Sequence, residues 1–113
     1  MTQRELAWAF IERTTRKEHV SFTYGDAPYL NVFGPSGSPP GARTAYVIIE
    51  QDGALSFRVQ AVAEELNAVE RPNVEHCGRA EWWLTPATLE ERYGTARAVV
   101  DAVVHVLQRH GHW

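Results

Sequence analysis

Several features that often guide an interpretation are scarce in these 113 residues. Cys77 is the single cysteine, which excludes an internal disulfide and fits a reducing compartment. No apolar run approaches the ~18 residues that cross a membrane. The opening residues Met1–Glu5 contain no apolar segment of the kind found in a signal peptide. We therefore expect a cytoplasmic protein with no membrane partner.

Positive charge is also in short supply. The chain has 11 basic residues against 14 acidic ones, a net charge of −3, and Lys17 is the single lysine. This balance gives no broad basic surface for phosphate groups. Apolar residues make up 44% and charged residues 22%, as in an ordinary globular protein, and the length fits one domain over residues 1–113.

The hydrophobic pattern changes period along the chain. Helical spacing occurs over 3–17, briefly around 62–69, and over 86–109, where Gly94-Thr95 predicts a bend. Alternating or continuous apolar runs predict strands at 20–24, 29–33, 45–49, 55–59 and 79–84. Asp52-Gly53 predicts a tight hairpin turn between two of these strands. The order predicts an α+β two-layer sandwich, an antiparallel sheet with helices on one face.

Two segments lie outside this pattern. Residues 34–41 hold three prolines and three glycines, which predicts an exposed loop, either a mobile hairpin tip or a recognition loop. Residues 110–113 follow the last helix and are expected to form a frayed tail. His105, His110 and His112 suggest a metal site, but zinc needs three or four ligands on rigid elements. We expect no metal and no cofactor.

The predicted sheet carries apolar residues on both faces. The strand at 45–49 is apolar at either parity, and adjacent Trp82 and Trp83 cannot both point toward the helices. Because one layer of helices covers only one face, large side chains remain on the other face or at its rim. Contiguous exposed apolar surface marks a binding site or an oligomer interface. Tyr46, Trp82 and Trp83 are therefore candidate partner-binding residues.

The stretch from Leu55 to Trp83 combines several motifs. The strand at 55–59 is followed by a short helix containing 63–66, then by the Arg71-Pro72 step, and then by a spaced set of His76, Arg79 and Trp82. With these motifs the stretch resembles the MmcQ/YjbR-like family of small bacterial proteins. The resemblance implies an α-β(3)-α-β(2)-α order, shared with type III secretion chaperones. It also implies a DNA-binding label with no established enzyme activity.

Two sets of residues could carry chemistry. His76 and Cys77 are adjacent, but neighbours in an extended segment point in opposite directions, so they are poorly placed to act as nucleophile and base. Arg58, Arg71 and Arg79 could share one edge and, with His76, contact an anion or a partner. Neighbouring carboxylates weaken this set as a phosphate site, because residues 50–70 hold five acids and one base.

These patterns favour a non-enzymatic binding protein that engages a macromolecular partner, or itself as a homodimer, through the open sheet face. A nucleic-acid-binding protein is the first alternative, although its charge disfavours that function. An inhibitor, immunity protein or secretion-chaperone-like protein for a basic partner is the second. A small-ligand or enzyme site around His76 and Cys77 is the third.

Overall fold

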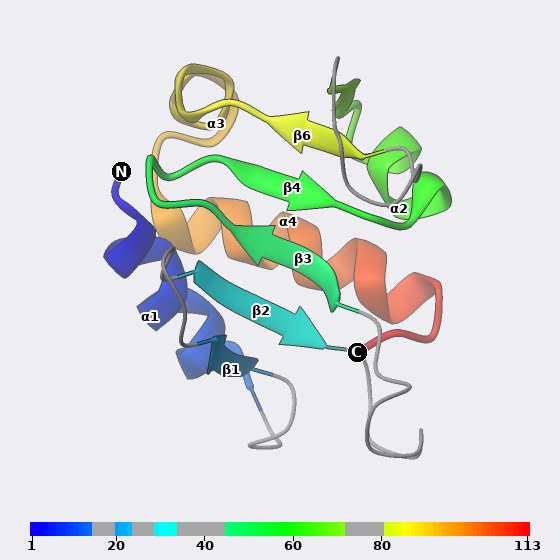
Figure 1. Cartoon of the computed structure of the whole chain (residues 1–113), viewed down its shortest axis with the longest axis horizontal. Helices are drawn as coiled ribbons and strands as arrows, with labels where there is room; N and C mark the ends of the chain where they lie inside the picture. Colours follow the sequence, from blue (N-terminus) through cyan, green and yellow to red (C-terminus); the bar gives the residue numbers. More distant parts are fainter. Residues whose placement is uncertain (15–19, 24–28, 34–44, 72–80) are drawn as a thin grey trace.

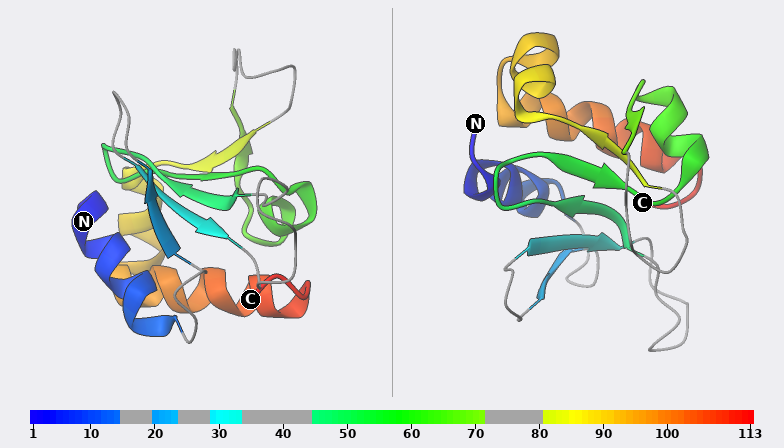
Figure 2. Two further views of the ribbon diagram at one scale, coloured as in Figure 1. Left: turned by 60° about the horizontal axis from the view of Figure 1, so that its bottom comes forward. Right: turned by 45° about the horizontal axis from the view of Figure 1, so that its top comes forward.

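The predicted α+β architecture is confirmed. A computed structural model describes residues 1–14, 20–23, 29–33, 45–71 and 81–113, and shows an open antiparallel sheet with helices packed on it (Figure 1). Two further views show α1 and α4 on the same side of the sheet (Figure 2). The opposite face carries none of the helices that the structure describes.

The helices and strands follow one another in nearly the predicted order. The helices are α1 (Gln3–Arg13), α2 (Gln60–Glu65), α3 (Pro86–Tyr93) and α4 (Ala96–Arg109). The strands are β1 (Val20–Thr23), β2 (Tyr29–Phe33), β3 (Ala45–Ile49), β4 (Leu55–Phe57), β5 (Val69–Glu70) and β6 (Trp82–Leu84). The predicted loop 34–41 lies outside the described residues.

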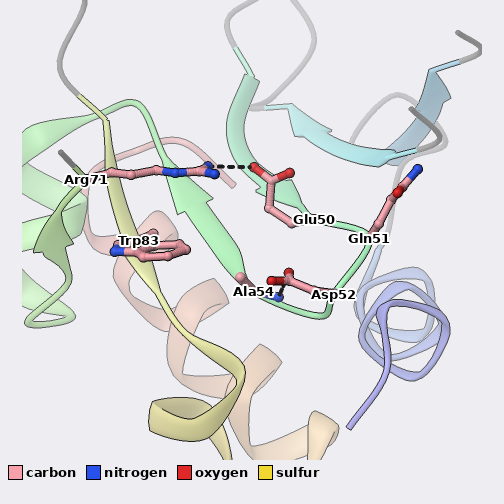
Figure 3. Close-up of a pocket in the computed structure, with 6 residues that line it drawn as sticks. All are labelled: Glu50, Gln51, Asp52, Ala54, Arg71 and Trp83. Atoms are coloured by element: carbon pink, nitrogen blue, oxygen red, sulfur yellow. Dashed lines mark hydrogen bonds and ion pairs between the residues drawn. The ribbon is translucent and has the colours of Figure 1, made fainter. Parts of the chain in front are cut away.

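The strand order is β1-β2-β3-β4-β6-β5, with every described pair antiparallel. The hairpin between β3 and β4 turns at Asp52-Gly53 as predicted, and Gly53 has φ +91°. The chain leaves the sheet after β4, forms α2 and β5, and then returns to place β6 between β4 and β5. Residues 50, 71 and 83, distant in sequence, therefore lie close together in space (Figure 3).

One face of the sheet forms the core with all four helices. Alternate residues of β3, β4 and β6 point toward the helices, because successive side chains in a strand face opposite ways. They are Val47, Ile49, Leu55, Phe57 and Leu84, and they form one buried cluster with residues of the helices such as Phe10, Val62, Leu89 and Val103. On β3, β4 and β6, these five side chains of the helix side are thus buried.

The predicted helix over 86–109 is two helices. Thr85 caps α3, and Thr95 caps α4 by accepting a hydrogen bond from the Ala98 N–H. The predicted bend at Gly94-Thr95 is therefore a break with its own N-cap. Among the described residues, no helix is both long and apolar enough to span a lipid bilayer.

The C-terminal residues, expected to form a frayed tail, instead pack against the fold. Gly111 (φ +74°) allows the His112 N–H to reach the Leu107 carbonyl at 2.8 Å, which closes the end of α4 with a Schellman-type cap. The reversed chain then places the His112 ring 4.2 Å from that of Tyr46, centre to centre. Burial, followed by the charge of His110, lowers the pKa of His112 below its ordinary value.

Candidate functional site

The face of the sheet away from the helices carries a row of side chains across four neighbouring strands. Ile48, Ser56 and Trp83 occupy matching register positions on β3, β4 and β6, and Val69 follows on β5. Ile48 and Ser56 are buried, Trp83 is half-buried, and Val69 is 65% exposed. In the described part of this face, apolar side chains are therefore exposed toward the β6–β5 edge rather than over β3 and β4.

Glu50 is the centre of a polar network beside this row (Figure 3). Its Oε1 accepts a 2.8 Å hydrogen bond from the Ser56 hydroxyl and lies 3.4 Å from an Arg71 guanidinium nitrogen. The same guanidinium sits over the indole of Trp83, with its Cζ 4.8 Å from the ring centre. Arg71 thus joins a carboxylate and an aromatic face, which is a cation–π arrangement.

A second ion pair anchors the neighbouring end of this face. Arg58 Nε lies 3.4 Å from Oε1 of Glu81, whose side chain is almost fully buried. The Arg71 N–H donates to the Glu81 carbonyl at 2.8 Å, which fixes the residue that follows β5. The backbone therefore positions Arg71 before its side chain makes any contact.

A hollow opens between the β3–β4 hairpin and β6. Its volume is about 220 Å³, and we call it the Trp83 surface, lined by Glu50, Gln51, Asp52, Ala54, Arg71 and Trp83. The turn is held by Oδ1 of Asp52, which accepts the Ala54 N–H at 2.9 Å. Two carboxylates and one guanidinium thus surround an indole.

The structure brings together two of the predicted site residues, Arg71 and Trp83. Arg58 instead pairs with Glu81 and does not line the hollow. His76, with its neighbour Cys77, and Arg79 lie outside the described residues. Among the residues that are described, no three His, Cys, Asp or Glu side chains gather in a way that could hold a metal ion.

Trp82 and Tyr46 do not lie on the open face. Trp82 is in register with Phe57 on the helix side of the sheet and packs against the core. Tyr46 is displaced by a bulge, because Val32 pairs with Val47 whereas Phe33 pairs with Ala45. The extra residue breaks the alternation, so Tyr46 packs against the core and stacks on the C-terminal segment.

The sequence prediction missed the acidic half of this site. Glu50, Asp52 and Ser56 were not predicted as site residues, although strand parity offers a signal for two of them. Glu50 has the parity of Ile48, and Ser56 lies opposite Ile48 once the Asp52-Gly53 turn fixes the register. The pairing of β4 with β6, which brings Trp83 alongside, has no comparable local signal.

Comparison with known proteins gives no match among family models, curated proteins or solved structures. The resemblance to MmcQ/YjbR-like proteins stays a prediction from the sequence.

Proposed function

We propose that this chain is a small non-enzymatic protein that binds a protein partner through the Trp83 surface. One observation carries the proposal: a half-buried tryptophan lies on the sheet face opposite the helices, in a hollow rimmed by charged side chains. Tryptophan and arginine are the residues most enriched among energetically dominant interface contacts. A partially covered indole with a polar rim fits the anchor point of a protein interface.

The charge arrangement supports a protein partner over nucleic acid. Both described members of the predicted arginine set are paired, Arg58 with Glu81 and Arg71 with Glu50. A phosphate would have to compete with these carboxylates, and affinity for nucleic acid depends on cations free to neutralise phosphates. An acidic protein of this kind suits an inhibitor, immunity or chaperone-like role toward a basic partner.

The test compares two tryptophans on opposite sides of the molecule. Trp8 is 57% exposed on α1, in the helical layer, and gives a matched control for Trp83. Immobilised wild type, Trp8→Ala and Trp83→Ala are exposed to native-host extract. We expect a protein that the wild type and Trp8→Ala retain and Trp83→Ala loses.

Self-association is measured in parallel by size-exclusion chromatography with light scattering. A dimer that Trp83→Glu dissociates identifies the partner as a second copy of the chain. The proposal is contradicted if the protein is a monomer and if wild type, Trp8→Ala and Trp83→Ala all retain the same proteins.

A further inference from the structure

Resting on the proposed function, we infer that the Trp83 surface recognises a cationic side chain, an arginine in particular, presented by the partner. Arg71 occupies this site within the chain itself and is the group that the partner's arginine replaces. Arg71 is thus an internal stand-in for the ligand. The partner's arginine and Arg71 therefore compete for the same contacts with Trp83 and Glu50.

The contacts of Arg71 show what the site accommodates. Its guanidinium lies between the Trp83 indole at 4.8 Å and the Glu50 carboxylate at 3.4 Å. A planar, weakly hydrated cation suits such a position better than a compact ammonium, because it stacks on the ring while it donates to the carboxylate. The site therefore favours arginine over lysine.

The hold on Arg71 is weak enough for exchange. A strong charge-assisted N–H···O contact measures about 2.7–2.9 Å, whereas this one is 3.4 Å, and about a third of each side chain is exposed. Partly exposed ion pairs of this kind contribute little net stability. Displacing Arg71 consequently costs the protein little, and a partner's guanidinium in better geometry gains the same two contacts.

Negative charge remains in the hollow after Arg71 is counted. Oε1 of Glu50 accepts the hydrogen bond from Ser56 and forms the ion pair with Arg71, and Oε2 has no partner among the described residues. Asp52 uses Oδ1 to hold the turn. Two carboxylates against one guanidinium attract a further cation and repel a phosphate. About 220 Å³ of open space equals that of several water molecules at ~30 Å³ each, which leaves room for a side-chain head group.

The experiment uses the peptide acetyl-Ala-Arg-Ala-amide, with its lysine and citrulline counterparts, titrated into ¹⁵N-labelled protein. The readout is the Trp83 indole N–H signal, assigned through Trp83→Phe. We expect the arginine peptide to shift this signal in a saturable manner, the lysine peptide to bind more weakly, and the uncharged citrulline peptide to leave it in place. Equal response to arginine and citrulline would overturn the inference.

Two substitutions then move affinity in opposite directions. Glu50→Gln removes the carboxylate and should lower the affinity for the arginine peptide roughly fivefold or more. Arg71→Gln removes the internal competitor and should raise that affinity by about threefold or more. The matched control is Arg13→Gln, because Arg13 forms a 3.4 Å ion pair with Asp101 in the helical layer. That variant should leave the affinity unchanged.

The sign of the Arg71 effect decides between ligand classes. If Arg71 itself contacts an anionic ligand, Arg71→Gln abolishes binding of an acidic peptide or oligonucleotide and gives no gain for the arginine peptide, which refutes the inference. Circular dichroism checks each fold, and Arg71→Lys replaces Arg71→Gln if the latter unfolds. If Trp83→Ala loses a partner that the arginine peptide fails to displace, this inference is refuted and the proposed function stands. If no partner depends on Trp83, the proposed function is refuted.

Discussion

The β3–β4 hairpin that carries Glu50 and Asp52 depends on a glycine that nothing larger can replace without loss. Gly53 has φ +91°, and a Cβ built there would lie 2.9 Å from the Met1 carbonyl oxygen. That oxygen belongs to the backbone, so it cannot swing away as the end of a side chain would. We expect Gly53→Ala to strain the turn and to push it away from the N-terminal residues.

The loss of stability in Gly53→Ala has two contributions, backbone strain and a steric clash. Left-handed backbone costs an alanine about 1–2 kcal/mol. A contact this short forces a shift of the surrounding backbone, for which overpacking substitutions cost a further ~1–3 kcal/mol. Gly53→Ala should therefore lower the free energy of unfolding by roughly 2–5 kcal/mol, a large part of the ~5–15 kcal/mol typical of a domain.

Gly111→Ala separates backbone strain from the steric clash. Gly111 has φ +74°, but a Cβ there would meet no atom within 4 Å. The Gly111→Ala protein should therefore lose only the stability due to backbone strain, about 1–2 kcal/mol. Both variants are compared with wild type by urea denaturation followed by tryptophan fluorescence. A Gly53→Ala protein no less stable than Gly111→Ala would refute the close contact between the hairpin and Met1.

Three further predictions concern the packing of β4, the protonation of His112 and the ion pair between Arg58 and Glu81. Phe57→Ala, at a fully buried position of β4, should reduce the free energy of unfolding by about 3–5 kcal/mol in urea denaturation. The lowered pKa of His112 means that the unfolded chain binds its proton more readily, so stability should fall as pH drops from about 7.5 to about 5.5. His112→Phe, which keeps a ring against Tyr46, should show a smaller fall; an equal one would remove His112 as the cause. Arg58→Met leaves the buried Glu81 unpaired and should cost roughly 1–2 kcal/mol, most of it recovered in a double variant with Glu81→Gln. A double variant no more stable than the single one would contradict this pairing.

Local patterns predicted most of the elements correctly. Helical periodicity identified α1, although it predicted an end at 17 and α1 ends at Arg13. The Asp52-Gly53 turn was predicted because glycine readily adopts the left-handed backbone that a tight hairpin needs, as Gly53 does here. Strand alternation also required that Trp82 and Trp83 face opposite ways, and the register confirms it.

The errors arose where a residue departs from regular periodicity. Tyr46 was a candidate for the partner-binding face, but a single extra residue in β3 turns it toward the core. The tail was judged frayed because terminal residues usually are, yet Gly111 reverses the chain and returns His112 to the sheet. Both features depend on one residue of backbone geometry, which hydrophobic patterns do not record.

The acidic part of the site could not be predicted because it depends on long-range pairing. Glu50 and Arg71 are 21 positions apart, and they meet only because β6 enters between β4 and β5. No local propensity encodes that insertion. The sequence showed an excess of acids over bases in this stretch, but not which carboxylate would face which guanidinium.

The position of β6 late in the sequence sets the order in which the site can be completed. During synthesis, Glu50 and Asp52 emerge first and Arg71 later, while the strand that supplies the indole emerges last of the three. A chain that ends before residue 82 displays the carboxylates without an aromatic platform, and pairings over such sequence distances form slowly. A partner that requires both groups consequently distinguishes fully folded copies from incomplete ones.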